Sequence, residues 1–256
     1  MLPRVVGSSL LPVCRDKRWG NVYFLLGKER RHPNWEDADS WADFSGSTKI
    51  LDNGTFETPE QTASREAWEE TASIVKFTET DHHLPIESPG KLLDDLTNGN
   101  FIFKIEFDRG NGIKYVTYVY EIPWDPSIPS RFAHLMKVLT QRFPHTRATE
   151  ESQRTSNTTL RAMFNDRTHP SINSVNGFCD RSFTEKAAIN LFGIPNLQKA
   201  IANDGLLIDK FGKKEYLRSS FVNRLVVIMN QLNYATIAPP VYIKYEEKIE
   251  DDTKKI

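Results

Sequence analysis

The sequence has few of the residues that build cross-linked or zinc-stabilised folds. Cys14 and Cys179 are its two cysteines, they lie far apart, and no CxxC pair or cysteine–histidine cluster occurs. A disulfide framework and a structural zinc site are therefore not expected. A reducing compartment is the simpler interpretation, and we predict a cytoplasmic protein, in the cytosol or the nucleus.

Long apolar runs and an excess of one charge are also missing. No segment approaches the roughly 20 apolar residues that span a bilayer, and the N-terminal stretch lacks the basic-then-apolar layout of a signal peptide. We therefore expect no membrane partner. The formal net charge is −1, so nucleic acid could bind only at a local basic patch and not to a generally basic surface.

What is present predicts an α+β fold. With 256 residues, 39% of them hydrophobic, the chain can form one large domain or a smaller domain with additions. Alternating and helical patterns then give a mixed sheet with helices on its faces. We expect strands at 4–16, 19–30 and 73–79, a hairpin at 100–124, helices at 58–72, 130–143 and 213–232, and a strand followed by a helix within 184–205.

The helix expected at 58–72 has a well-marked start. Thr58 can cap its first turn, Pro59 suits the first helical position, and Glu60 and Gln61 favour the positive end of the helix dipole. The boundary matters because it fixes which later side chains share a face.

Three glutamates in this helix stand at an unfavourable spacing. Glu66 lies three and four residues before Glu69 and Glu70, so the like charges are neighbours and cost about a few tenths of a kcal/mol per pair. Only Arg65 is near enough to compensate. Spacing alone leaves two interpretations open, a solvated acidic face and a site for a divalent cation that binds carboxylate oxygens.

The surrounding residues resemble the Nudix box, G-x5-E-x7-R-E-U-x-E-E-x-G-U, in which U is aliphatic. Every charged position of that motif is present at its spacing, in Glu57, Arg65, Glu66, Glu69 and Glu70. The resemblance implies a Nudix fold and a hydrolase that cleaves a diphosphate linked to another group. It covers about residues 5–123 and 183–232 and includes a lead-in strand before the box that keeps one glycine, Gly46.

The uncharged box positions depart from the motif. Its first glycine falls at Leu51, so the loop is expected to be a few residues longer than usual, with Gly46 and Gly54 flanking that position. Its late glycine falls at Ala72 and its last aliphatic residue at Ser73, with Ile74 as a substitute. These positions shape the backbone, so their loss puts the loop geometry in doubt and leaves the metal ligands unaffected.

Roles for the charged residues follow from the resemblance. It implies that Glu57, Glu66, Glu69 and Glu70 bind Mg²⁺ or Mn²⁺, that Glu66 alternatively orients the attacking water, and that Arg65 orients the glutamates. Arg65 is expected to pair with Glu57 or Glu66, which makes Glu57 structural first and a ligand second. The general base is expected after the sheet, at Glu185. Glu121, at a strand end, is the alternative.

The group attached to the diphosphate is not specified by the motif. Three regions are candidates: a basic cluster at a strand end, aromatic residues that could stack on a base, and a basic segment that could follow an RNA backbone. A basic turn and core packing are the alternatives for the first two. The residues are, in that order, Lys28, Arg30, Arg31 and His32; Trp35, Trp41 and Phe44; and Arg131, Lys137, Arg142, Arg147, Arg154 and Arg161.

The length of the chain adds a finer expectation. We predict a Nudix domain at 1–123 and 183–235, a helical insertion at 124–182 and a C-terminal tail at 236–256. Such an enlarged chain is similar to viral Nudix enzymes that remove mRNA caps, releasing methylated GDP, and that also cleave diphosphoinositol polyphosphates; the host cytoplasm would then be the location. Capped RNA, inositol pyrophosphates and nucleotide derivatives are thus the candidate substrates, and a non-catalytic RNA-binding protein is the alternative from another class.

Overall fold

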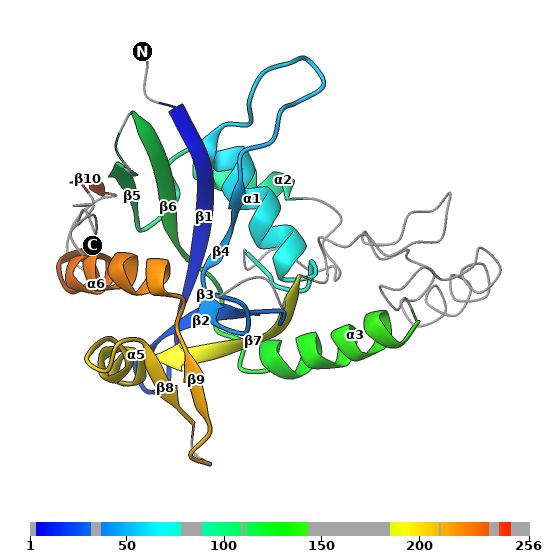
Figure 1. The fold of residues 1–256 in the computed structure, drawn as a ribbon, viewed down its shortest axis with the longest axis vertical. Coiled ribbons are helices and arrows are strands. Elements are labelled where there is room, and N and C mark those ends of the chain that lie inside the picture. The colour runs from blue at the N-terminus through cyan, green and yellow to red at the C-terminus, as the bar shows by residue number, and fades with distance from the viewer. Residues whose placement is uncertain are drawn as a thin grey trace, which may run out of the picture.

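The computed structural model of the protein describes residues 4–31, 37–77, 89–108, 110, 112–142, 185–209, 211–235 and 241–246. Its main sheet has eight strands: β1 (Arg4–Arg15), β2 (Val22–Glu29), β3 (Trp41–Ala42), β4 (Phe44–Ser47), β5 (Phe103–Asp108), β6 (Ile113–Glu121), β7 (Lys186–Gly193) and β10 (Val241–Glu246). They are ordered β10-β5-β6-β1-β2-β3, with β4 paired to β1 and β7 to β2 (Figure 1). The pairs β1–β6 and β5–β10 are parallel, and the rest are antiparallel, so the sheet is mixed.

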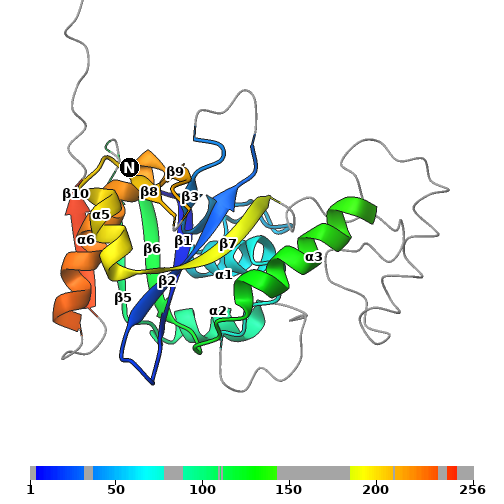
Figure 2. The same cartoon turned by 90° about the horizontal axis from the view of Figure 1, so that it is seen from below.

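Helices cover both faces of this sheet. They are α1 (Pro59–Glu70), α2 (Gly90–Thr97), α3 (Ile128–Arg142), α5 (Ile194–Ile201) and α6 (Ser219–Ala235). Figure 2 shows α1, α2 and α3 on one side and α5 and α6 on the other. A separate hairpin, β8 (Leu206–Ile208) with β9 (Lys214–Tyr216), extends from the α5 side. The predicted α+β class, with a mixed sheet between helices, is confirmed.

Strand alternation produces the two layers of core. Adjacent residues of a strand point to opposite faces, and in β1 and β2 both faces are apolar. Leu10 and Leu25 pack with α1, α2 and α3, whereas Leu11 and Leu26 pack with α5 and α6. Two apolar faces explain why these strands read as continuous apolar runs in the sequence.

Most elements expected from local pattern are present. β1 and β2 form the antiparallel pair expected at the N-terminus, and β5 and β6 form the expected hairpin. The helix expected at 58–72 is α1, the one at 130–143 is α3 beginning two residues earlier, and the strand and helix within 184–205 are β7 and α5. Each of these has its turn residues and its apolar spacing within one short window of sequence.

Four expectations need correction. Residues 73–77 form a turn and irregular backbone where a strand was predicted, because Ala72 and Ser73 take left-handed backbone angles. The helix predicted at 213–232 starts at Ser219, and the residues before it form β9. Helix α2 was not predicted, and β10 lies in the segment taken for a tail. Longer-range packing decides each of these segments.

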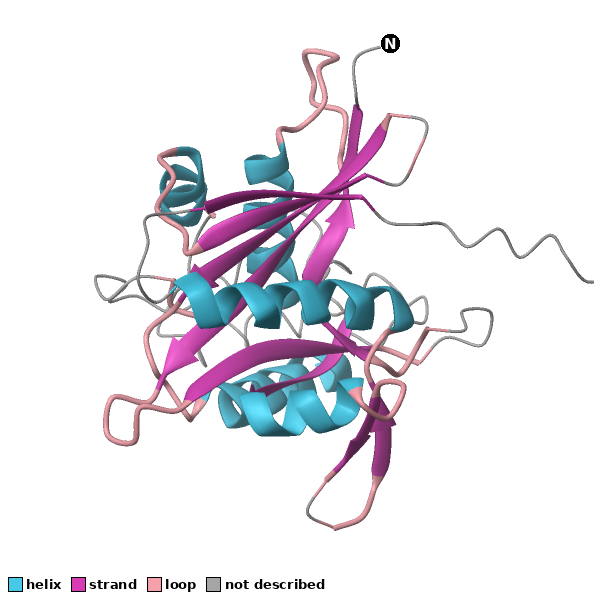
Figure 3. Cartoon of the chain, turned by 90° about the vertical axis from the view of Figure 1, so that its left-hand side faces the viewer, coloured by secondary structure: helices cyan, strands magenta, loops and turns pink. Residues whose placement is uncertain are grey.

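The longest described helix, α6, lies across the strands of the main sheet (Figure 3). It buries Phe221, Leu225 and Ile228 against them. None of the helices in the described part of the chain has the length and apolar character needed to cross a lipid bilayer.

Candidate functional site

The acidic helix α1 is fixed at its start by a capping box. The Thr58 hydroxyl accepts a hydrogen bond from the Gln61 amide at 3.2 Å, and the Thr58 amide donates to the Gln61 side chain at 2.8 Å. Reciprocal bonds of this kind satisfy two otherwise unpaired donors. Because the start is fixed, the inner face of the helix is fixed too: Glu66 and Glu70 are buried and Glu69 is partly buried.

Arg65 gathers three of the glutamates. Its guanidinium binds Glu57 through two bonds, from Nε at 2.7 Å and from Nη2 at 2.9 Å. Its Nη1 donates to Glu66 Oε1 at 2.6 Å and to Glu69 Oε2 at 3.2 Å. Arg65 was expected to pair with Glu57 or Glu66, and it contacts both. We call Glu57, Glu66 and Glu69 with Arg65 the acidic cluster.

Glu57 anchors this arrangement from the loop before α1. Besides Arg65, its carboxylate accepts bonds from the Lys49 amide at 3.0 Å and the Thr62 hydroxyl at 3.1 Å. Burial alone would raise the pKa of Glu57, but these bonds to its charged form outweigh burial and lower the pKa to about 2. Glu57 is thus ionised, and its carboxylate is held by Arg65, Lys49 and Thr62.

The lowered pKa of Glu57 predicts acid sensitivity of the fold. Its ordinary pKa is 4.5 and its folded value about 2, so its stabilisation is complete above pH 4.5 and is lost as the pH falls towards 2. The free energies of unfolding of the wild type and of Glu57→Gln should therefore converge by about 3 kcal/mol over that range. Urea titrations at several pH values measure this difference. A constant difference between pH 6 and pH 3 would contradict it.

Gly46 makes room for the carboxylate of Glu66. A Cβ atom at position 46 would lie 2.0 Å from Glu66 Oε1 and 2.2 Å from its carboxyl carbon. The glutamate therefore lies directly against the backbone of β4, where a side chain would exclude it. This glycine, the one kept in the lead-in to the box, sets the position of Glu66.

The positions at which the box motif expects glycine or an aliphatic residue have their own backbone conformations. Ala72 and Ser73 have φ angles of 51° and 54°, the left-handed conformation that favours glycine. In the loop before α1, Gly54 has a φ of 78° and its amide donates to the Leu51 carbonyl at 2.8 Å. The turn therefore uses Gly54, and the C-terminal turn of α1 forms without a glycine.

Glu70 faces a different partner from the other glutamates. Its Oε1 lies 2.9 Å from Nζ of Lys186, and its Oε2 accepts a bond from the Ser45 amide at 2.7 Å. Lys186 also forms a short ion pair with Glu29, and Arg218 lies 3.6 Å from that glutamate. Both oxygens of Glu70 are thus engaged. The sequence analysis did not predict this group of Lys186, Glu29 and Arg218. The alternating pattern of β7 could have shown that Lys186, at the start of an apolar strand, points inward.

Burial and charge shift the pKa values of these groups in opposite directions. Burial, with Glu29 and Glu66 nearby, raises the pKa of Glu70 well above its usual value, against the effect of Lys186. Burial would lower the pKa of Lys186, but Glu70 and Glu29 outweigh it and raise that pKa. Burial also raises the pKa of Glu69. At Glu69, burial thus outweighs the opposite effects of Lys49 and Arg65.

The donor set of the acidic cluster fits a hard cation. Within the described ranges, no group of three or more histidine, cysteine, aspartate or glutamate side chains is placed to hold a metal ion. Mg²⁺, however, is commonly held by one or two carboxylates together with substrate phosphates and waters. Glu66 and Glu69 are two such carboxylates that converge on one nitrogen of Arg65. They fit Mg²⁺ or Mn²⁺ arriving with a phosphate-rich substrate.

A pocket of about 430 Å³ lies next to β4, the strand that contacts Glu66 and Glu70. Its size is in the range of small-molecule sites. Arg224, in its wall, is buried and held by Asp43 through two bonds of 2.9 Å, whereas Arg218 is partly exposed. The polar lining consists of Ser45, Ser47, Tyr115, Arg218, Ser220, Arg224 and the carboxylate of Asp37, which lies 3.7 Å from Arg218. Guanidinium and hydroxyl groups of this kind suit phosphate oxygens.

The predicted aromatic stacking residues that the structure describes are in the core. Phe44 is fully buried among the side chains under α1. Trp41 is buried too, its indole donates to Glu215 at 2.6 Å, and its ring meets Phe192 edge-on. Core packing, the alternative interpretation, is what these two residues do. Trp35 lies outside the described residues.

The predicted basic cluster at the end of β2 is divided. Lys28 is buried and paired with Asp39 at 2.9 Å and with Glu215 at 3.0 Å, on the face away from α1. Arg30 is partly buried, and burial lowers its pKa; Arg31 is exposed. His32 lies outside the described residues, so the structure brings no group of these cations to the acidic cluster within the described part of the chain.

The two predicted base candidates are exposed. Glu185 precedes Lys186 and points to solvent while the lysine points inward, and Glu121 is exposed at the end of β6. Of the basic residues in the expected insertion, Arg131 pairs with Asp125 at 2.5 Å and Lys137 is exposed on α3. Arg147, Arg154 and Arg161 lie outside the described residues, as does the side chain of Arg142.

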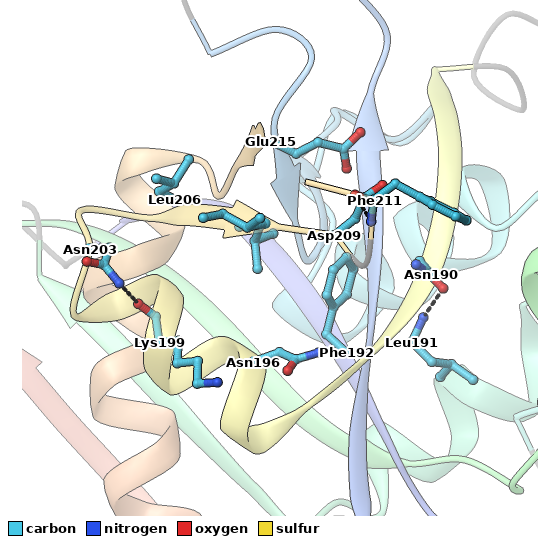
Figure 4. A pocket seen from close by; sticks show the side chains of 12 residues that line it. Asn190, Leu191, Phe192, Asn196, Lys199, Asn203, Leu206, Asp209, Phe211 and Glu215 are labelled. Carbon is cyan, nitrogen blue, oxygen red and sulfur yellow. Dashed lines mark hydrogen bonds between the residues drawn. The ribbon is translucent and has the colours of Figure 1, made fainter. Parts of the chain in front are cut away.

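A larger pocket, of about 650 Å³, lies elsewhere, between β7, α5 and the β8–β9 hairpin (Figure 4). No residue of the acidic cluster lines it. Its wall combines aromatic rings with amides and charged groups, among them Asn190, Phe192, Asn196, Lys199, Phe211 and Glu215. It is therefore separate from the carboxylates and does not form part of the candidate site.

No family model matches the chain, and no curated protein matches it. Solved structures similar to it include a Nudix hydrolase from M. smegmatis (18% identity, 49% of this chain and 65% of that one, TM-score 0.29) and the NUDIX domain of Shewanella oneidensis NrtR in complex with ADP ribose (9%, 91% and 90%, 0.40). A C. elegans Ap4A hydrolase is a third (15%, 46% and 66%, 0.25). The chain thus spans less than two thirds of the M. smegmatis protein. All three TM-scores are 0.40 or lower.

Proposed function

We propose that this chain is a Nudix hydrolase that cleaves a diphosphate linkage with Mg²⁺ or Mn²⁺. The observation that supports this best is the convergence of Glu66 and Glu69 on one nitrogen of Arg65, with Glu66 against Gly46. These residues also stand in the register of the Nudix box. A solvated acidic face would not need a partly buried arginine bound to three glutamates, or a glycine that admits one carboxylate.

The residues of the chain have distinct proposed roles in the reaction. Glu66 and Glu69 would hold the cation, and the cation, when bound, neutralises phosphate charge and lowers the pKa of water. Arg65 keeps the two carboxylates together and is itself held by Glu57. Water attacks one phosphorus, the bridging P–O bond breaks, and the proton of the water passes through a base to the leaving phosphate.

Glu66 is the base that the geometry supports best. It is already in the cluster, and one of its oxygens, Oε1, is held by Arg65 at 2.6 Å. Glu185, the base that the resemblance implies, is exposed and would have to turn towards the cluster. Glu121 is exposed as well. Glu185 and Glu121 therefore remain alternatives whose side chains would have to move towards the acidic cluster to act as the base. Glu66 is already there.

The pocket beside β4 supports a substrate with several phosphates. Arg218, which lies 3.7 Å from Asp37, and the hydroxyl groups of Ser45 and Ser47 could receive a further phosphate on the face of β4 opposite the one against which Glu66 lies. Within this class we propose the 5′ cap of mRNA, with release of methylated GDP, and a diphosphoinositol polyphosphate or a nucleoside-diphosphate derivative as alternatives. Helix α3, with its exposed Lys137, packs beside β7 and so lies on the side from which RNA could approach.

A substrate panel tests the proposal. Cap-labelled RNA, free cap analogue, a diphosphoinositol polyphosphate and a nucleotide sugar are each incubated with the protein and Mg²⁺ or Mn²⁺. We expect cleavage of the diphosphate in at least one of them, and release of methylated GDP from long RNA in preference to the free analogue. Equal cleavage of capped RNA and free cap analogue would show that the chain does not need to contact the RNA backbone. RNA binding without any cleavage would favour the non-catalytic alternative.

A further inference from the structure

Lys186 is a fully buried lysine in contact with the carboxylates of Glu29 and Glu70. Its side chain is 0% exposed, its Nζ lies 2.9 Å from Glu70 Oε1, and it forms a still shorter pair with Glu29. A buried ammonium is strongly unfavourable unless it is paired. The lysine therefore belongs to a built site and is not a surface charge that happens to lie close.

The strands around Lys186 are shaped to admit it. β7 pairs with β2, and the register shifts by one residue between Lys28 and Glu29, opposite the start of β7. Irregularities of this kind change the direction of side chains. A Cβ atom at Gly27 would lie 3.0 Å from Cδ and Cε of Lys186, so this glycine leaves space for the lysine stem.

The two groups of carboxylates differ in how deeply their cations are buried. Glu29 and Glu70 share the fully buried ammonium of Lys186, and Arg218, 3.6 Å from Glu29, also lies 3.7 Å from Asp37. The acidic cluster, by contrast, has its carboxylates around Arg65, whose side chain is 14% exposed, and Lys49 adds an exposed ammonium at 3.8 Å from Glu69. Glu70 is 2% exposed, whereas Glu66 and Glu69 are 10% and 12% exposed, so an incoming cation reaches Glu66 and Glu69 more readily than Glu70.

We infer that Lys186 is a positioning residue that takes the place of a metal ion at Glu70, so that the site binds one divalent cation, through Glu66 and Glu69, before substrate arrives. The inference rests on the proposed function and restricts it. Glu70 then acts through Lys186 and Ser45, as a support for β4 and β7. Any further cation has to come with the phosphates of the substrate.

Titration of the full chain with Mn²⁺, followed by electron paramagnetic resonance without substrate, tests the inference. The wild type should bind one ion. Lys186→Met should bind a second, because Glu29 and Glu70 would become carboxylates without their lysine. Lys114→Met, which removes a lysine paired with Glu106 at 2.9 Å on another part of the sheet, should bind one ion. Two ions on the wild type, or one ion on folded Lys186→Met, would overturn the inference.

A second pair of variants covers the case in which Lys186→Met does not fold. Glu70→Gln should keep the Mn²⁺ affinity of the wild type, whereas Glu69→Gln should weaken it by about ten-fold or more. An equal loss in both would show that Glu70 is a ligand and would refute the lysine's role. If Glu70→Gln loses Mn²⁺ while the substrate panel is cleaved, the inference fails and the proposed function stands. If the wild type binds one Mn²⁺ but cleaves nothing, the proposed function fails and the inference stands. If the wild type does not bind Mn²⁺ at all, both are overturned.

Discussion

Glu69→Gln is expected to reduce kcat for the diphosphate substrate by about 10²–10³-fold and to leave the fold intact. A metal ion contributes several kcal/mol of charge stabilisation in such reactions, and each 1.36 kcal/mol is about ten-fold in rate. Glu69 is one of two carboxylates proposed to hold that ion. Replacing Glu69 should change the free energy of unfolding little, because Arg65 keeps two closer partners, Glu57 at 2.7 Å and Glu66 at 2.6 Å.

Steady-state kinetics at saturating Mg²⁺, with circular dichroism as a check of folding, measure this effect. Asp94→Asn is the matched control, because it removes an exposed carboxylate from the neighbouring helix α2 and should keep the wild-type rate. A Glu69→Gln enzyme with nearly wild-type kcat would remove Glu69 from the metal site. The proposal would then depend on Glu66 alone.

Gly46→Ala is expected to have the second largest effect, a loss of about 10²-fold in kcat with little loss of stability. The added methyl group would lie 2.0 Å from Glu66 Oε1, so the carboxylate has to move and its bond to Arg65 is broken or bent. Displacement of a reacting group by about 1 Å can cost this much. The fold should survive because the clash is with the end of a flexible side chain.

Gly193→Ala separates this effect from a general cost of replacing glycine. A Cβ atom at position 193 would meet its nearest neighbour, in the ring of Tyr23, at 3.6 Å, an ordinary contact. Because Gly193 is the N-cap of α5, its replacement can cost stability of that helix, so the loss of kcat and not the urea unfolding separates the two variants. Full activity of Gly46→Ala would mean that Glu66 has another productive position, and its role as ligand and base would need revision.

Elements with local signals were predictable, and those that depend on distant packing were not. Helix α1 follows from Thr58, Pro59 and Gln61, which lie together at its start and form the capping box. The segment after it reads as a strand because Val75 and Phe77 are apolar and alternate, yet both are buried in irregular backbone. The alternating pattern correctly predicts that these two side chains are buried, but it wrongly predicts that their backbone forms a strand.

The candidate site divides in the same way. The spacing of Arg65, Glu66 and Glu69 is local, and it was enough to predict that they meet. Trp41 and Phe44 offer apolar surface that can stack on a ligand or fill a core, and only the packing of β3 and β4 on the rest of the sheet decides. Lys186, the partner of Glu70, could not be predicted from the box, because it belongs to β7 and is far from Glu70 in the sequence.

The ion pair between Lys186 and Glu29 also sets an order of events during synthesis. The two residues are 157 positions apart in the chain, so a ribosome completes β2, β4 and α1 long before it makes the lysine. Until β7 docks, burying Glu29 and Glu70 would leave two carboxylates without this cation, at an expense of several kcal/mol for each ion. We therefore expect Glu29 and Glu70 to stay hydrated until β7 docks, so the candidate site should close only after Lys186 has been made.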